Sequence, residues 1–416
     1  SEMCIRDRGI PAITLSDGPN GVRKQAGAAD HLGLNPSVPA TCFPTSSATA
    51  CSWDEKLGEA VGEALGEEAA AQEVAVLLGP GLNIQRSPLC GRDFEYFSED
   101  PILAGRMAAA YVRGIQKNGI SACPKHFAVN SQELRRMASD SVLDERTLRE
   151  LYLTGFEIVV KEAKPKTIMT SYNLINGTYA NENAHLLQDI LRKDWGFDGA
   201  VVTDWGGSND HALGVKNGST LEMPCPGGDS IRELMKAVQG GKISEADVDA
   251  RLDEMLELVL STHAAVEKAP RTFDAAAHHK LARRAAAESI VLLRNEGGIL
   301  PLKPNEKLAV IGDFAETPRY QGAGSSAVNA LQVDTLLDSI KADDSGITFV
   351  GYASGFERQG AADAEKLEEA VALAKKADTV LLCLGLDELR ESEGLDRSDM
   401  KLAENQQQLL AAVAAV

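Results

Sequence analysis

A carboxylate stands at the end of a short apolar run near the middle of the chain. Small and β-branched residues at positions 199–203 are followed at once by Asp204-Trp205-Gly206-Gly207. This pattern predicts a short buried strand that ends on Asp204, with a flexible turn behind it. In a barrel of alternating strands and helices, the carboxyl ends of the strands hold the catalytic groups. Our hypothesis is that Asp204 is a nucleophile, although the local pattern alone also fits a capping carboxylate.

Other polar side chains occupy similar positions, and each also has an ordinary structural interpretation. Asp17 fits a turn that caps its own backbone, Arg92 fits a surface salt bridge, and a histidine at a strand end such as His126 is more often structural than catalytic. Taken together, they place cations, a histidine, a phenol and carboxylates in loops that converge on one cavity. Such a mixture suits a neutral, polyhydroxylated ligand, whose hydroxyl groups charged donors can orient. The candidates besides Asp204 are Asp17, Arg92, Lys125, His126, Arg136 and Tyr172.

Composition narrows the class of partner. The 416 residues carry a formal net charge of -19, with 44% apolar and 25% charged residues, as in an ordinary soluble globular protein. The negative charge, without a compensating basic stripe, argues against nucleic acid and against anionic membranes. No apolar run approaches the roughly 20 residues that a membrane span needs. We therefore expect a small neutral substrate, with a homo-oligomer left open.

The cysteines argue against a disulfide framework and against a zinc site. Seven cysteines are scattered through the chain without any Cys-x-x-Cys pair. Reduced thiols in a cytoplasmic protein are the simpler interpretation. We predict no metal and no cofactor.

The elements that must position these residues alternate between helix and strand. Helical patterns are predicted at 54–73, 102–117, 145–162 and 184–193, and they lead into strands at 74–78, 120–124, 167–171 and 199–203. Four repeats of this alternation predict parallel βα units in a barrel or a doubly wound sheet. A short strand at Ser219–Glu222 and a long helix from Ser244 follow. That helix has a capping-box start and an apolar face, formed by Val248, Leu252, Met255, Leu256 and Val259.

A second α/β region follows a linker. Glu267–Thr272, which contains Pro270, is the best linker candidate, and a helix through His278–Glu288 then leads into an apolar run at Ile290–Arg294. Three more apolar runs, at 308–311, 347–350 and 379–384, predict further strands.

The two ends of the chain suggest a fragment. Residues 1–8 have no signal-peptide pattern and resemble a translated sequencing adapter, so we interpret them as a non-native leader. The last residues, 409–416, stop inside a helical pattern without a cap. We expect the parent protein to be longer at both ends, with the first barrel strand missing.

A series of ordered motifs resembles glycoside hydrolase family 3, specifically its β-glucosidases, from Gly9 to the end. The quoted motifs are Ile10-Pro11-Ala12, Asp17-Gly18-Pro19-Asn20-Gly21-Val22-Arg23, Arg92-Asp93-Phe94-Glu95-Tyr96-Phe97-Ser98-Glu99-Asp100-Pro101, Lys125-His126-Phe127-Ala128-Val129-Asn130, Thr203-Asp204-Trp205-Gly206, Leu221-Glu222-Met223-Pro224 and Val291-Leu292-Leu293-Arg294-Asn295-Glu296. The resemblance implies an α/β fold in which a TIM-like barrel is followed by an α/β sandwich, with the active site between them. On this basis we assign residues 9–266 to the barrel, 267–285 to a linker and 286–416 to an incomplete sandwich domain.

The resemblance also implies roles for individual residues. It makes Asp204 the nucleophile and makes Asp17, Arg92, Lys125, His126, Arg136 and Tyr172 the binding site for the terminal sugar. Trp205 would offer a ring face to that sugar, and Tyr172 would also hydrogen-bond the nucleophile. The glycine- and serine-rich loop at 322–326 borders the sugar site in the family, and Ser325 is its candidate contact.

A retaining glycosidase needs a second carboxyl about 5–5.5 Å from the first. By the resemblance, the acid/base is the glutamate directly before the glycine in Glu391-Ser392-Glu393-Gly394, hence Glu393, with Glu391 as the fallback. Composition alone would instead predict that this charged loop is solvated surface. We expect Asp204 to be kept ionised by Lys125, Arg92 and Arg136, and Glu393 to be protonated in a less charged setting.

The resemblance implies a retaining, exo-acting β-glucosidase that needs no cofactor. A β-xylosidase or α-L-arabinofuranosidase of the same family is the nearest alternative, and Trp205 beside the nucleophile favours the glucosidase. A β-N-acetylglucosaminidase is disfavoured, because Ala128-Val129-Asn130-Ser131 replaces the Pro-Gly-His-Gly that supplies its histidine acid/base. Outside this class, a nucleotide-binding oxidoreductase and a noncatalytic sugar-binding protein remain open. The glycines at 322 and 324 follow the preceding apolar run too late for a dinucleotide-binding turn.

Overall fold

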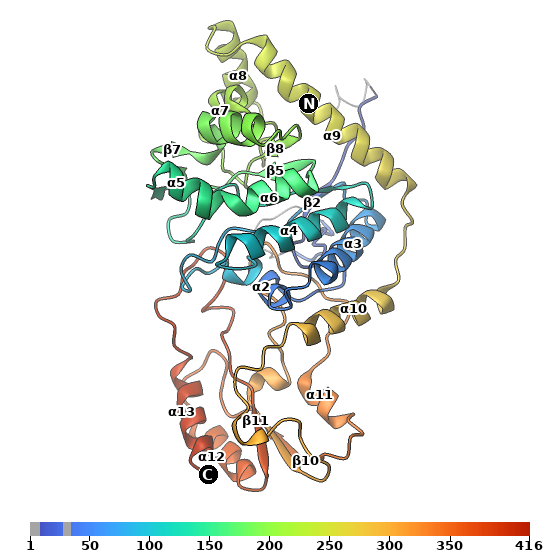
Figure 1. Ribbon diagram of the computed structural model, residues 1–416, viewed down its shortest axis with the longest axis vertical. Helices are drawn as coiled ribbons and strands as arrows, with labels where there is room; N and C mark the ends of the chain where they lie inside the picture. The colour runs from blue at the N-terminus through green and yellow to red at the C-terminus, as the bar shows by residue number, and fades with distance from the viewer. Residues whose placement is uncertain (1–8, 28–34) are drawn as a thin grey trace. The chain divides into compact units, whose positions relative to one another are not determined.

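The computed structural model describes residues 9–27 and 35–416 and divides the chain into two compact units. Unit 1 contains the described residues up to Ile290, together with Gln321–Leu331 and Glu393–Asp396. Unit 2 contains Val291–Tyr320, Gln332–Ser392 and Arg397–Val416. The chain is α/β, with helices and parallel strands alternating through both units (Figure 1). The predicted leader at residues 1–8 lies outside the described residues, and the predicted domain limits stay predictions.

Short parallel strands form the centre of unit 1. Strands β1 (Leu15–Asp17), β2 (Val76–Leu78) and β3 (Ser121–Ala122) form one parallel sheet in that order. Strands β5 (Thr167–Met169) and β8 (Ala200–Val202) form a parallel pair. Single bridges from Phe127 to Thr170 and from Val202 to Leu221 continue the pairing. The strands β2, β5 and β8 are buried along their whole length, as expected where helices cover a parallel sheet.

Three helices of unit 1 pack side by side. They are α3 (Glu55–Ala71), α4 (Pro101–Gln116) and α6 (Thr154–Ala163) (Figure 1). Asp54 and Asp100 cap the first two helices by accepting hydrogen bonds from main-chain N–H groups of the first turn. Glycines bring α3 and α4 close together, since a Cβ atom at Gly62 would lie 2.4 Å from the carbonyl oxygen of Tyr111. A larger residue at Gly62 would therefore push the two helices apart.

The helix predicted at 145–162 is interrupted. It forms as α5 (Glu145–Thr147), a π-helical stretch at Leu148–Leu153, and α6. The Thr154 hydroxyl donates to the carbonyl oxygens of Arg149 and Glu150, which lie five and four residues earlier. This side-chain bonding accompanies the widened turn. The segment predicted as a helix at 184–193 is likewise π-helical, over His185–Asp194.

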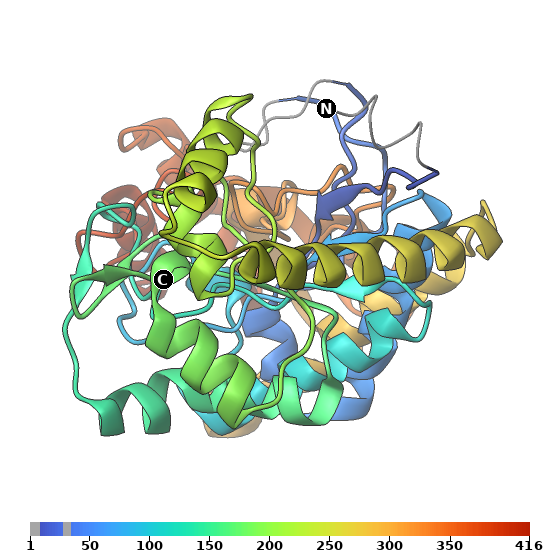
Figure 2. The same cartoon turned by 90° about the horizontal axis from the view of Figure 1, so that it is seen from above.

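Helix α9 (Glu245–Lys268) begins as predicted and runs as one long helix, yellow in Figure 2. The Ser244 and Asp247 side chains form the predicted capping box. The predicted apolar face is wrong at Leu252, which is 52% exposed. The side chains that α9 buries are Leu258, Val259, Thr262 and Val266. The earlier apolar positions are partly buried at most: Val248 packs against the cluster of Ala212, Ala237 and Ile243, and Met255 packs against the cluster that contains Leu258.

Two predicted strands do not form. Of Ser219–Glu222, only Leu221 pairs, as a single bridge to Val202. Ile290–Arg294 has no strand neighbour among the described residues, and Leu293 is 91% exposed. A strand needs a partner for its main-chain hydrogen bonds, and an apolar run alone does not supply one.

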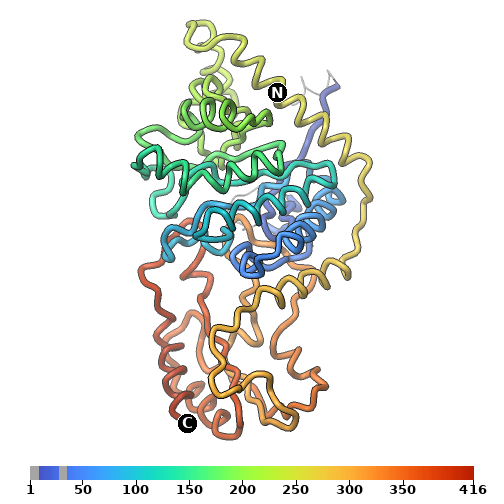
Figure 3. The backbone as a smooth tube through the Cα atoms, in the orientation of Figure 1, coloured from blue at the N-terminus to red at the C-terminus, as the bar shows by residue number. Residues whose placement is uncertain are grey.

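The sheet of unit 2 has three parallel strands. The orange-to-red part of the tube in Figure 3 traces the backbone of this unit. Strand β9 (Lys307–Ile311) lies between β10 (Thr348–Ala353) and β11 (Thr379–Leu382), close to the ranges predicted. Helices α12 (Ala364–Ala374) and α13 (Glu404–Ala414) lie together, and Phe356, Ala370 and Leu409 belong to their buried cluster with Ile311. Helix α11 (Leu336–Lys341) contributes Leu337 to a second cluster with Val310.

The remaining elements of unit 1 are short. They are α2 (Ser46–Ala50), β4 (Asp140–Ser141), β6 (Leu174–Ile175), β7 (Thr178–Tyr179), α7 (His211–Asn217) and α8 (Asp229–Gln239). Within the described ranges, no helix combines the length and the apolar character of a membrane span.

Helix α10 (Ala275–Glu288) occupies part of the predicted linker and is held by a buried histidine. His278 is 6% exposed, and its Nδ1 atom lies 2.7 Å from Oε1 of Glu68 on α3. Its Nε2 atom lies 3.2 Å from Oε2 of Glu67, while Oε2 of Glu68 accepts from the N–H of Thr41. Burial opposes the charge, but the two glutamates outweigh it and raise the pKa of His278. The imidazolium thus ties α10 to α3.

We expect His278→Asn to destabilise the protein most at low pH. Because the folded-state pKa of His278 is raised above its ordinary 6.5, its stabilisation is fully present below that pH. It is lost as the pH rises through the higher folded-state value. The free energy of unfolding should fall by about 1.5–3 kcal/mol in the acidic part of this range, measured by denaturant titration at several pH values. His263→Asn, which removes a partly exposed pair with Glu267, is the control and should change little. A loss for His278→Asn that is the same at all pH values would contradict the charged pair.

Candidate active site

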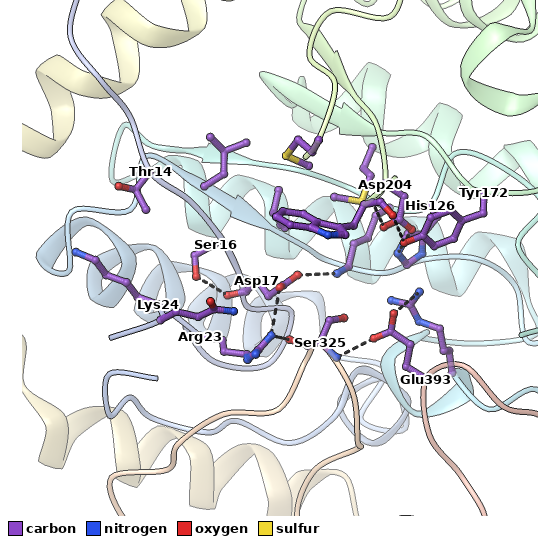
Figure 4. Close-up of a pocket in the computed structure, with 18 of the residues that line it drawn as sticks. Thr14, Ser16, Asp17, Arg23, Lys24, His126, Tyr172, Asp204, Ser325 and Glu393 are labelled. Carbon is purple, nitrogen blue, oxygen red and sulfur yellow. Dashed lines mark hydrogen bonds and ion pairs between the residues drawn. The ribbon is translucent and has the colours of Figure 1, made fainter. Parts of the chain in front are cut away.

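One cavity of about 290 Å³ lies within unit 1, at the carboxyl ends of its strands (Figure 4). Asp17 is the last residue of β1, Tyr172 follows β5 and Asp204 follows β8. Every site residue predicted from the sequence lines the cavity except Arg136, which bonds to the lining residue Glu393. The lining residues are Thr14, Leu15, Ser16, Asp17, Arg23, Lys24, Gln25, Gly27, Leu78, Arg92, Lys125, His126, Met169, Tyr172, Asp204, Trp205, Met223, Ser325 and Glu393.

Asp204 is 9% exposed and oriented by its neighbours. The N–H of Trp205 donates to its Oδ1 at 2.7 Å, and Nε2 of His126 lies 3.5 Å from its Oδ2. The Tyr172 hydroxyl donates to the carbonyl oxygen of Trp205 at 3.0 Å. Burial, and then the nearby charge of Asp204, raise the pKa of Tyr172, so this phenol keeps its proton. The carboxylate thus faces the cavity with its orientation fixed.

His126 is a neutral donor rather than a base. Burial and the charges of Arg92, Lys125 and Arg136 hold its pKa well below the ordinary value. Its Nδ1 atom lies 3.2 Å from the Tyr96 hydroxyl, which accepts from Nδ2 of Asn130. Because the hydroxyl already accepts from Asn130, this arrangement favours a hydrogen bond donated by the hydroxyl to Nδ1, and hence the tautomer with its hydrogen on Nε2, the nitrogen nearest Asp204. Tyr96 and Asn130 set this tautomer.

The two arginines contact Glu393, not Asp204 as we expected from the sequence. Nη1 of Arg136 lies 2.9 Å from Oε1 of Glu393, and Nη1 of Arg92 lies 3.6 Å from the same oxygen. Each arginine also pairs with a second buried carboxylate. For Arg92 this is Glu95 at 2.5 Å, and for Arg136 it is Glu133 at 2.7 Å.

The protonated form that we expected for Glu393 is correspondingly wrong in this structure. Burial raises the pKa of Glu393, but Arg92, Arg136 and hydrogen bonds from Ser325 outweigh burial and hold the pKa far below its ordinary value. The N–H of Ser325 donates to Oε2 at 2.7 Å. Sequence reasoning placed the cations correctly in the site but could not give their partners.

Asp17 pairs with two further cations of the cavity, Lys125 and Arg23. Nζ of Lys125 lies 3.7 Å from one of its oxygens, and Nη1 of Arg23 lies 3.6 Å from the other (Figure 4). Burial raises the pKa of Asp17, against the lowering effect of Lys125. Arg23, whose side chain is 2% exposed, was missed from the sequence. Its position, six residues after Asp17 in the same turn-rich motif, could have indicated that it belongs to the site.

The loop at Gln321–Leu331 brings Ser325 to the cavity. The carbonyl oxygen of Ala323 accepts from the N–H of Glu393 at 3.0 Å. Gly324 has a φ of +116°, and a Cβ atom there would lie 2.4 Å from Cβ of Glu393. The glycine is therefore required both for its backbone conformation and for space.

Glu391, the fallback for the acid/base, is engaged elsewhere. Its carboxylate pairs with Arg319 at 2.8 Å, and both residues belong to unit 2. Within the described ranges, no group of three or more histidine, cysteine or acidic side chains could hold a metal ion.

Comparisons with known proteins agree on one family. The "Glycosyl hydrolase family 3 N terminal domain" matches residues 28–258, and the "Glycosyl hydrolase family 3 C-terminal domain" matches residues 290–416. Thermostable beta-glucosidase B of Acetivibrio thermocellus is 46% identical over 98% of this chain and 54% of its own length. The exo-alpha-(1->6)-L-arabinopyranosidase of Bifidobacterium longum is 44% identical over 99% and 55%. The chain thus spans about half the length of these curated relatives.

A solved structure gives the same result. The crystal structure of Bifidobacterium adolescentis GH3 beta-glucosidase superposes with a TM-score of 0.91 at 43% identity. The match covers 99% of this chain and 58% of that one.

We expect Gly324→Ala to destabilise the protein and to displace Glu393. The positive φ and the close contact should lower the free energy of unfolding by about 1–3 kcal/mol, measured by thermal or denaturant unfolding. Gly385→Ala is the matched control, because its added methyl group would meet Phe314 at an ordinary 3.8 Å. Equal stability of the two variants would contradict the close packing of this loop on Glu393.

Proposed function

The chain belongs to glycosyl hydrolase family 3, and on this premise we propose that it carries the active site of a retaining, exo-acting β-glucosidase. Such an enzyme hydrolyses terminal, non-reducing β-D-glucosyl residues. The observation that carries the proposal is that Asp204 and Glu393 line one cavity among buried hydrogen-bond donors. A pair of carboxyl groups is what retaining hydrolysis requires.

In the proposed reaction Asp204 is the nucleophile. Its carboxylate attacks the anomeric carbon while the bond to the leaving oxygen breaks, which gives a glycosyl-enzyme ester. Glu393 protonates the leaving oxygen, then takes a proton from water as that water attacks the ester and releases the sugar. The Nε2–H of His126 and the N–H of Trp205 keep the attacking carboxylate in place. Trp205 provides a ring face for the sugar.

The charge on Glu393 has to change when substrate enters. Arg92 and Arg136 favour its ionised form. Sugar hydroxyl groups that accept hydrogen bonds from these arginines would share their donors, and burial would then favour the protonated acid. Asp17, Lys125 and Arg23 also line the cavity and could hold further hydroxyl groups.

The family also suggests the finer architecture. We infer that unit 1 corresponds to a TIM-like barrel, supported by the parallel strands whose carboxyl ends surround the cavity. The three-stranded parallel sheet of unit 2 fits an α/β sandwich domain. The boundary near residue 286, the homo-oligomer and the cytoplasmic location remain predictions from the sequence.

A second candidate is an α-L-arabinopyranosidase, because one relative at 44% identity carries that name. The β-xylosidase and α-L-arabinofuranosidase alternatives have no such relative among those reported above. All these activities use the same pair of carboxyl groups, so they differ only in which sugar the cavity holds.

We expect a 2-deoxy-2-fluoro-β-glucoside with a good leaving group to label Asp204. The fluorine slows hydrolysis of the ester, so mass spectrometry of the digested protein should find the sugar on the peptide that contains Asp204. Asp204→Asn should lose both labelling and hydrolysis, with kcat lower by roughly 10⁴-fold or more. Aryl β-D-glucosides, β-D-xylosides and α-L-arabinopyranosides compared side by side give the sugar preference. Labelling at another carboxylate would refute the assignment.

We expect Glu393→Ala and Glu391→Ala to behave differently. Glu393→Ala should keep hydrolysis of 2,4-dinitrophenyl β-D-glucoside but lose roughly 10²–10⁴-fold on unactivated glucosides, which need a proton on the leaving oxygen. Azide should accelerate this variant and give β-glucosyl azide. Glu391→Ala, the matched control, should stay within a few-fold of wild type. Azide rescue of the Glu391 variant instead would transfer the acid/base role to that residue.

A further inference from the structure

Residues 393–396 form a short segment that clusters with unit 1, whereas the residues on both sides of it cluster with unit 2. The segment contributes one side chain, Glu393, to the cavity. Such a segment needs hydrogen bonds that hold it against unit 1, because an unrestrained loop gains conformational entropy when it moves away. Those bonds determine where Glu393 points.

Asp396 is the principal acceptor among them. Its Oδ1 accepts from the main-chain N–H of Gly91 at 3.1 Å and from that of Glu133 at 2.9 Å. Its Oδ2 accepts from the N–H groups of Glu133 at 3.0 Å and Leu134 at 2.9 Å. Hydrogen bonds to an ionised carboxylate are among the strong ones. One half-buried side chain therefore binds two separate loops of unit 1.

Glu133 returns a bond in the opposite direction. Its Oε2 accepts from the N–H of Gly394 at 2.8 Å, while its own N–H bonds to Asp396. The two acids thus form a reciprocal interlock, each side chain accepting from the main chain of the other segment. The Glu133 side chain is fully buried, and the same Oε2 holds Nη1 of Arg136 at 2.7 Å.

The loops that Asp396 joins are those that carry the arginines of the site. Gly91 directly precedes Arg92, and Leu134 lies two residues before Arg136. Both arginines contact Oε1 of Glu393. The other oxygen of Glu393 accepts from the N–H of Ser325 (Figure 4). Asp396 consequently fixes the distance between the acid and the cations that control its proton.

We propose that Asp396, together with Glu133, is a positioning residue for Glu393, setting where the acid/base carboxyl stands without touching the substrate. This inference rests on the proposed function for the role of Glu393. A residue that only stabilised the fold would lower every activity by the same factor. A residue that positions the acid should matter most when the leaving group needs a proton.

The test compares Asp396→Asn with Asp399→Asn in the full chain. Asparagine keeps the shape but loses the charge and one acceptor, whereas Asp399 is an exposed residue that caps the N–H of Lys401. For Asp396→Asn we expect kcat/KM to fall about 10- to 100-fold on phenyl β-D-glucoside and by less than about 3-fold on 2,4-dinitrophenyl β-D-glucoside. Asp399→Asn should match wild type on both. Glu133→Gln, which weakens the interlock from the other side, should reproduce the leaving-group pattern.

Hydrogen exchange supplies a readout that needs no activity. Peptides that contain Gly394 and Glu133 should lose protection in Asp396→Asn and keep it in Asp399→Asn. Equal losses of kcat/KM on the two glucosides, or unchanged protection at Gly394, would overturn the positioning role. If wild type hydrolyses neither glucoside, the proposed function fails, while the exchange experiment still decides whether Asp396 holds the segment.

Discussion

Two guanidinium groups, the buried Arg92 and the half-buried Arg136, are each shared between two carboxylates, and the site depends on these contacts. Arg92 lies between Glu95 and Glu393, and Arg136 lies between Glu133 and Glu393. A buried charge is tolerated only when it is paired and hydrogen-bonded. Glu95 and Glu133 each supply a second carboxylate, so neither arginine depends on Glu393 alone for an opposite charge.

Asp204 is maintained by a different kind of contact. Its neighbours are a main-chain N–H and a neutral imidazole, with the full positive charges directed to Glu393 and Asp17. Neutral donors orient a carboxylate without quenching its nucleophilicity as strongly as a direct ion pair would. The two carboxyl groups of the cavity therefore stand in different electrostatic surroundings, although the surroundings are the reverse of those expected from the sequence.

The sequence predicted those features that a local pattern of neighbouring residues determines. Strand ends such as Asp17 and Asp204 follow from an apolar run and a turn, and the capping box at Ser244 follows from spacing alone. The ion-pair partners could not be predicted, because Arg92 and Glu393 are brought together only by the fold. Tyr96, Asn130, Glu133 and Asp396 were missed for the same reason. Apolar runs also mislead when no neighbour covers them, as at Leu252 and Leu293.

The bonds to Asp396 have a consequence for sequence divergence among relatives. All of its donors are main-chain N–H groups, at Gly91, Glu133 and Leu134, and any amino acid except proline supplies such a group. The amino acids at positions 91 and 134 can consequently change, whereas the aspartate at position 396 has to be kept as the acceptor. Substitutions at these two positions, other than to proline, therefore leave the hydrogen bonds that hold the segment 393–396 in place.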